Sequence, residues 1–232
     1  MGLRRDADKT YRSTKEFSLI MIEIIPAINA DNFEEIKRKI KLAEPHTDWI
    51  HIDVADGTFT KNTLWHNAAD LALLDTKLNI GVHLMINNVE RRIDDWLVSG
   101  VKRIIFHIEG SKDPDFVINR CKEAGVETDI SIGPEESVIK AMKYKNNVDA
   151  FQILGVHPGL AGQKIESNVY DRIKEVRSFC SSCIIEVDGG MNKETISQAV
   201  EAGANRIVAA SAVFNDRDIG ENIEELKKSC RI

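Results

Sequence analysis

Several features that mark other classes of protein are scarce or missing in this chain of 232 residues. No apolar run approaches the 18 residues of a membrane-spanning helix, so no membrane partner is expected. The 31 Lys and Arg are outnumbered by 37 Asp and Glu, and a net charge of -6 argues against nucleic acid as a partner. The N-terminus lacks the apolar stretch of a secretory signal, so we expect a cytoplasmic location.

Cysteine is scarce as well. Four cysteines in a chain of this length do not predict a disulfide framework. Cys180 and Cys183 have the CxxC spacing of redox motifs and of half metal sites, but no second CxxC accompanies them. A redox or zinc role for this pair is therefore the weaker interpretation. Linkers, repeat arrays and low-complexity tracts are missing too, which indicates one domain.

What the chain does contain is a regular alternation of strand-like and helical segments. The strand-like runs fall at residues 22–28, 49–54, 80–85, 102–107, 127–132, 149–156, 183–188 and 205–209. Helical segments end at Gly125 and Gly203, and Asn192 can cap another, with Thr195 at its third position.

Eight strands alternating with eight helices predict an α/β fold, a (β/α)8 TIM barrel over residues 21–232. An open doubly wound sheet is the alternative, but no GxGxxG follows the first strand. Residues 1–20 are polar, mixed in charge and without clear periodicity. We interpret them as an N-terminal extension, ordered or disordered.

Four side chains able to bind a metal ion lie near the ends of predicted strands. His51 and Asp53 are two residues apart and therefore point to the same face of the second strand. His83 ends the third strand, and Asp188 ends the seventh, directly before two glycines. Barrel enzymes place their chemistry at these carboxyl ends. Two His and two Asp predict one divalent metal ion, with Zn, Fe(II), Mn and Co all suitable.

The reaction that such a site favours is proton transfer next to a carbonyl group. A divalent ion polarises the carbonyl, and a carboxylate removes the proton from the adjacent carbon. Asp53 and Asp188 come from strands separated around the barrel. One carboxylate can then take the proton while the other returns a proton to the opposite face, which is epimerisation.

Loops rich in small residues follow the sixth, seventh and eighth strands. Barrels bind phosphate at these loops and at the start of the last helix, through backbone N–H groups. His157 stands at the mouth of the first loop, where it either contacts substrate or caps the loop. The candidate phosphate-binding residues are Gly159, Ala161, Gly162, Gly189, Gly190, Ala210 and Ser211.

Taken in order, several segments resemble the ribulose-phosphate 3-epimerase family from about residue 22 to the end of the chain. They are Pro26-Ala27-Ile28, His51-Ile52-Asp53-Val54-Ala55-Asp56-Gly57, His83-Leu84-Met85, Phe106-His107-Ile108-Glu109, His157-Pro158-Gly159-Leu160-Ala161-Gly162-Gln163, Val187-Asp188-Gly189-Gly190 and Ala210-Ser211-Ala212-Val213-Phe214.

This resemblance implies a barrel of the ribulose-phosphate-binding type that interconverts D-ribulose 5-phosphate and D-xylulose 5-phosphate in the pentose phosphate pathway. It implies a divalent metal ion held by His51, Asp53, His83 and Asp188, with the two aspartates as the acid/base pair. Met85 would line the site. A sugar phosphate would be the substrate, and a homo-oligomer the assembly. For His107, beside Glu109, we favour a structural or supporting role.

The chain also departs from the family around this site. The family's first strand usually reads Pro-Ser-Ile-Leu-Ser, whereas residues 26–30 read Pro-Ala-Ile-Asn-Ala. Ala55 and Leu154 stand where the family has methionines. These departures keep two alternatives open: a 3-epimerase for another ketose phosphate, such as allulose 6-phosphate, and a non-catalytic barrel that binds a sugar phosphate.

Overall fold

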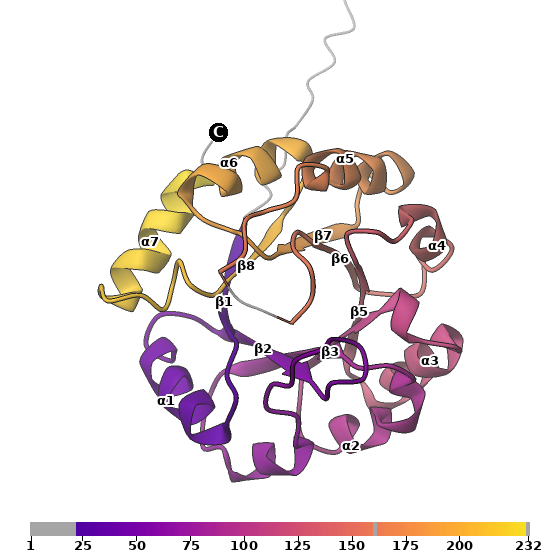
Figure 1. Cartoon of the computed structure of the whole chain (residues 1–232), viewed down its shortest axis with the longest axis horizontal. Coiled ribbons are helices and arrows are strands. Elements are labelled where there is room, and N and C mark those ends of the chain that lie inside the picture. The colour runs from indigo at the N-terminus through magenta and orange to yellow at the C-terminus, as the bar shows by residue number, and fades with distance from the viewer. Residues whose placement is uncertain (1–21, 160–161, 231–232) are drawn as a thin grey trace, which may run out of the picture.

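The structure is a computed structural model that describes residues 22–159 and 162–230. In this part of the chain, eight parallel strands close into a barrel, each pairing with its neighbours in sequence and β1 pairing with β8. Figure 1 looks down the barrel and shows the helices arranged around its outside. The predicted (β/α)8 fold is confirmed. The predicted extension at residues 1–20 lies outside the described residues.

The strands are β1 (Glu23–Ile28), β2 (Trp49–Ala55), β3 (Asn79–Met85), β4 (Arg103–His107), β5 (Glu127–Ile132), β6 (Ala150–Leu154), β7 (Ile184–Asp188) and β8 (Arg206–Ala209). The α-helices are α1 (Phe33–Ala43), α2 (Ile93–Leu97), α3 (Pro114–Ala124), α4 (Val138–Met142), α5 (Val169–Phe179), α6 (Lys193–Ala202) and α7 (Ile219–Ser229). In the described residues, no helix is long and apolar enough to cross a bilayer.

One expected α-helix is replaced by a 3₁₀ helix. The connection between β2 and β3 folds as the 3₁₀ segment Ala68–Leu73, so the described residues hold seven α-helices rather than eight. Trp65 Nε1 and Asn67 Nδ2 donate to the two carboxylate oxygens of Asp70 at 2.8 and 2.7 Å and hold the chain in this tight turn. The buried residues of the segment, Ala68 and Leu71, have the three-residue spacing of a 3₁₀ helix.

The predicted ends of the later helices are confirmed. Gly125 and Gly203 adopt the left-handed conformation directly after α3 and α6. At the start of α6, Asn192 Oδ1 accepts from the Thr195 amide at 3.2 Å, and Thr195 Oγ1 accepts from the Asn192 amide at 2.9 Å. This capping box fixes the start of α6 a few residues after Asp188, at the end of the barrel where the strands have their carboxyl ends.

The apolar core lies between the strands and the surrounding helices. On β2, for example, Ile50, Ile52 and Val54 are fully buried in one large apolar cluster. The residues that alternate with them, His51 and Asp53, make contacts inside the barrel instead. The outer face of the sheet therefore packs against the helices, and the inner face carries the polar side chains together with small apolar clusters.

Ion pairs between strands show how polar the barrel interior is. Arg206 of β8 donates from Nη1 to Asp129 Oδ2 of β5 at 3.0 Å, and the same nitrogen lies 3.5 Å from Glu186 Oε2 of β7. Arg103 of β4 lies 3.5 Å from Asp129, Nε to Oδ2, and its guanidinium stacks 3.8 Å from the Trp49 ring centroid. Buried charges are costly unless they are paired, and these residues pair with neighbouring strands and, from β8 to β5, across the barrel.

The CxxC pair is joined in a disulfide. Cys180 and Cys183 are bonded just before β7, at the end of that strand opposite to Asp188. Cys121 and Cys230 are free. This is a single local disulfide rather than a framework, and the group of possible metal ligands among the described residues lies elsewhere.

Removing the Arg206 guanidinium should strongly destabilise the fold. Arg206→Met leaves Asp129 and Glu186 buried without their shared cation, and we expect a loss of about 3 kcal/mol in the free energy of unfolding, measured by urea titration. The control is Arg38→Met, which removes an exposed pair with Glu35 and should leave the urea midpoint close to that of the parent protein. Equal midpoints for the two variants would contradict the role of the interior pairing.

Candidate active site

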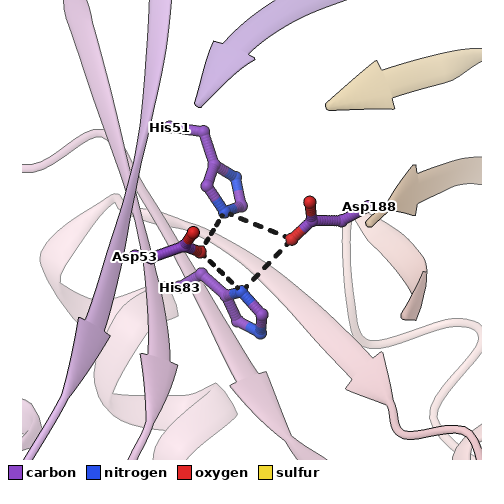
Figure 2. Close-up of side chains that lie close together, drawn as sticks. All are labelled: His51, Asp53, His83 and Asp188. Carbon is purple, nitrogen blue, oxygen red and sulfur yellow. Dashed lines mark hydrogen bonds and ion pairs between the residues drawn. The ribbon is translucent and has the colours of Figure 1, made fainter. Parts of the chain in front are cut away.

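Four side chains from three strands meet at the carboxyl end of the barrel, as Figure 2 shows. His51 Nε2 lies 3.3 Å from Asp53 Oδ1 and 3.7 Å from Asp188 Oδ2. His83 Nδ1 lies 3.2 and 3.4 Å from the same two oxygens. Parallel pairing of β2 with β3 sets Asp53 beside His83, and closure of the barrel brings Asp188 to them from β7. The residues predicted as metal ligands are thus neighbours in space.

The geometry of this cluster fits a divalent ion. One nitrogen or oxygen from each residue lies within 4.8 Å of all the others. An ion with four ligands at about 2.0–2.1 Å in a tetrahedron holds its donor atoms about 3.3 Å apart. The four His–Asp separations, from 3.2 to 3.7 Å, lie around that value. Imidazole and carboxylate donors suit Zn, Fe(II), Mn and Co alike.

The charges in the cluster shift one another's pKa. Burial alone would raise the pKa of the Asp53 carboxyl, but hydrogen bonds from His51 and His83 outweigh it and hold this pKa well below its ordinary value. Burial alone would lower the pKa of His83, but Asp188 and Asp53 raise it to about 9. The pKa of His51 is also raised, by Asp53 and Asp188 against burial. The site therefore strongly favours positive charge.

A chain of hydrogen bonds supports His83 from behind. His83 Nε2 lies 2.9 Å from His107 Nε2, and His107 Nδ1 lies 3.1 Å from Glu109 Oε1. When His83 offers Nδ1 to the cluster, its Nε2 carries the hydrogen and donates to His107, whose Nδ1–H then donates to Glu109. Burial lowers the pKa of His107, which suits a neutral ring. The supporting role favoured for His107 from the sequence agrees with these contacts.

Glu186 and Gln152 support the cluster from deeper in the barrel. Glu186 Oε1 lies 4.0 Å from His51 Nδ1 and accepts from Gln152 Nε2 at 2.9 Å. Gln152 Nε2 also lies 3.5 Å from Asp188 Oδ2. Sequence reasoning missed both residues. The available signal was their position two residues before the ends of β6 and β7, which places them on the inner face.

A cavity of about 280 Å³ adjoins the cluster. Asp53, His83 and Asp188 contribute to its lining, together with Met85, as expected. The predicted phosphate loops contribute as well, through Gly159, Gly162, Gly189, Gly190, Ala210 and Ser211. The fold thus brings the candidate metal ligands and the candidate phosphate loops to the same hollow.

Two glycines after β7 are required by the shape of this cavity. Gly189 and Gly190 have φ angles of 94° and 71°, which side chains other than glycine rarely adopt. A Cβ on Gly189 would lie 2.5 Å from Val156 Cγ2, and one on Gly190 would lie 2.8 Å from Ile165 Cβ. Glycine at both positions therefore lets the loop after β7 pack closely against Val156 and Ile165.

Some predicted residues lie elsewhere. The structure does not bring His157 to the cavity: the His157 side chain is 60% exposed, with Nε2 3.8 Å from Glu166 Oε1. Pro158 and Gly159, after the turn, line the cavity in its place. Ala161 lies outside the described residues.

The residues that depart from the family pattern differ in whether they line the cavity. Ala27 packs with Ile25 and Val208 in a small apolar cluster, and Ala55 packs with Met85 in another. Neither alanine is part of the cavity lining, whereas Leu154 is. Of these three positions, Leu154 is therefore the one that can alter the wall of the cavity directly.

Solved structures share this architecture at low sequence identity. A 3-hexulose-6-phosphate synthase matches 90% of this chain and 99% of its own with a TM-score of 0.68 and 14% identity. A mutant tryptophan synthase α-subunit from Pyrococcus furiosus matches 90% and 96% with a TM-score of 0.64 and 14% identity. These similarities define the class of fold, a (β/α)8 barrel.

Sequence comparison is more specific. The Ribulose-phosphate 3 epimerase family matches residues 23–214. The chain is 33% identical to the chloroplastic ribulose-5-phosphate-3-epimerase of Arabidopsis thaliana, over 96% of this chain and 82% of that one. It is 34% identical to the ribulose-phosphate 3-epimerase of Bacillus subtilis, over 90% and 100%. The chain therefore belongs to the ribulose-phosphate 3-epimerase family.

Metal affinity should fall as the pH is lowered. Metal binding needs neutral imidazoles, yet the pKa of His83 is raised to about 9 and that of His51 is also raised, so protons must leave when an ion binds. Between pH 8 and 6, the apparent Kd should rise about tenfold per pH unit for each proton displaced. Titration of the metal-depleted protein with Zn or Mn in buffers of different pH measures this, and a Kd independent of pH would contradict it.

Proposed function

We propose that this chain is a metal-dependent epimerase that inverts C3 of a ketose phosphate, with D-ribulose 5-phosphate and D-xylulose 5-phosphate as its substrate pair. The observation that carries this proposal is that Asp53 and Asp188, from β2 and β7, line one cavity beside two buried histidines. Membership of the family, and the names of relatives at 33 and 34% identity, support the choice of substrate.

In this proposal, His51, Asp53, His83 and Asp188 hold one divalent ion. A bound ion supplies a Lewis acid that lowers the cost of negative charge on the substrate's carbonyl oxygen. Backbone groups of the loops after β6, β7 and β8 bind the phosphate, because N–H groups at such loops favour anions. Met85 and Leu154 exclude water from the reacting carbon.

Over one turnover, one proton leaves C3 and one proton is added to its opposite face. One aspartate removes the C3 proton and becomes a carboxylic acid, while the electrons of the C3–H bond form a C2–C3 double bond and the carbonyl oxygen becomes an enediolate oxygen. The second aspartate, initially protonated, delivers its proton to the opposite face of C3, and the carbonyl reforms. Proton exchange with solvent then resets the two carboxyl groups. Asp53 and Asp188 approach from different strands, as this two-sided transfer requires.

A second candidate substrate is another ketose phosphate, such as allulose 6-phosphate. Leu154 in the cavity lining favours it, because the family usually has methionine there. The cytoplasmic location and the homo-oligomer stay predictions. Among relatives, the Arabidopsis thaliana protein is named as chloroplastic and an Oryza sativa protein as a cytoplasmic isoform.

Asp188→Asn should lower epimerisation by a factor of about 100 to 10,000, because it removes one of the two groups that transfer protons. The measurement is exchange of the C3 hydrogen of ribulose 5-phosphate in deuterated water, with formation of xylulose 5-phosphate and with metal content quantified. Asp56→Asn is the matched control. The Asp56 carboxylate accepts a hydrogen bond from the Thr58 amide in a turn, and Asp56 is not part of the cavity lining. Near-normal turnover by Asp188→Asn would refute the two-carboxylate mechanism.

The unaltered protein separates the remaining alternatives. Exchange at C3 of allulose 6-phosphate that is much faster than at C3 of ribulose 5-phosphate would favour the second substrate. Stoichiometric metal with no exchange on ribulose 5-phosphate would direct the search to other ketose phosphates. Neither metal retention nor exchange would favour a non-catalytic barrel.

A further inference from the structure

Asn29, directly after β1, makes a contact with one of the two aspartates. Its Nδ2 donates to Asp53 Oδ2 at 3.2 Å, and the side chain is part of the cavity lining. The register of β1 on β2 pairs Ile28 with Ile52, so the next residue along each strand, Asn29 and Asp53, lie side by side. Sequence reasoning assigned Asn29 no role.

The two oxygens of Asp53 have different surroundings. Oδ1 lies 3.3 Å from His51 and 3.2 Å from His83, within the metal-binding cluster. Oδ2 accepts the hydrogen bond from Asn29. Both oxygens of the Asp53 carboxylate are therefore held, Oδ1 by the two histidines of the cluster and Oδ2 by Asn29, which lines the cavity.

Asp188 is supported differently. The Gln152 amide lies 3.5 Å from Asp188 Oδ2, which is the same oxygen that faces His51 and His83. The amide near Asp188 thus meets the cluster oxygen, whereas the amide near Asp53 meets the other oxygen. The two aspartates are therefore held in different ways, although each would transfer a proton at one face of the substrate's C3.

We propose that Asn29 is a positioning residue that aims Asp53 Oδ2 at the substrate's C3. The terminal torsion of an aspartate has a broad energy minimum, so a carboxylate fixed only through Oδ1 would sample a range of orientations. A donor on Oδ2 narrows that range, and small errors in the placement of a reacting group are costly for rate. Asn29 is itself anchored, because Lys39 Nζ donates to its carbonyl at 3.4 Å and the Trp65 amide donates to the Ala30 carbonyl at 2.9 Å. This inference rests on the proposed epimerase function.

The consequence is an effect on one half of the reaction. Asn29 contacts Asp53 and not the cluster oxygens, so its loss should slow proton transfer at one face of C3 while leaving metal binding unchanged. The epimer whose C3 proton Asp53 removes should be affected in its abstraction step, and the other epimer should not. A residue that served only to stabilise the loop would not distinguish the two epimers.

The test uses Asn29→Leu, which keeps the approximate size of the side chain and removes the donor. We expect kcat to fall about tenfold or more with little change in KM, because a hydrogen bond to a charged group is lost. The primary isotope effect should rise for one of the two C3-deuterated substrates, ribulose 5-phosphate or xylulose 5-phosphate, and not for the other. Asn67→Leu removes a comparable surface bond to Asp70 and should match the parent protein.

Four outcomes would overturn the proposal, and they separate its failure from failure of the epimerase function. Normal kcat in Asn29→Leu, or an equal rise in both isotope effects, would remove the positioning role and leave the epimerase function intact. Loss of metal affinity in Asn29→Leu, measured by titration without substrate, would show that Asn29 serves the cluster instead. No C3 exchange by the parent protein would overturn the epimerase function, and the positioning role with it.

Discussion

The need to pair charges inside the barrel shapes the rest of this structure. The outer face of the sheet is apolar and holds the helices, but on its inner face Arg206 contacts Asp129 across the barrel and Glu186 on the neighbouring strand. Because an unpaired buried charge costs several kcal/mol, these contacts require the strands to close in one register. Glu186 continues the same set of contacts toward His51, so the pairing reaches from the barrel interior to the candidate metal ligands.

At the carboxyl end of the barrel, pairing of buried charges produces a site that can hold a cation. Two buried imidazoles and two carboxylates meet there, and the carboxylates raise the pKa of His83 to about 9 while the histidines depress the pKa of Asp53. Such a cluster stabilises positive charge, either as protons on the imidazoles or as a divalent cation. His107 and Glu109 favour the cation, because they leave His83 with Nδ1 free of hydrogen and turned toward Asp53 and Asp188.

The sequence predicted those parts that depend on local rules. The order of strands follows from periodicity, the start of α6 from Asn192 and Thr195, and the position of Asp188 from its place at the end of a buried strand. The parts that were missed depend on which side chains of different strands meet in the folded barrel. That Arg206 meets Asp129, or Asn29 meets Asp53, requires the closure and register of the sheet, which no local pattern encodes. The two alternatives for His157 could not be separated from the sequence, because the direction of a side chain at a turn depends on the path of the loop.

The positions at which the chain departs from the family fall into two groups, those behind the cavity and those that form its wall. Ala27 and Ala55 lie in small apolar clusters behind the cavity, so shortening those side chains alters the packing around the site without itself forming the wall. Asn29 and Leu154 do form the wall, and Asn29 adds a donor where the family's usual leucine has none. A polar group added beside the proposed acid/base residue changes how that residue is held, whereas an apolar exchange changes the space available to a ligand. The orientation of Asp53 and the choice of ketose phosphate are therefore separate properties of this cavity, since they depend on different residues.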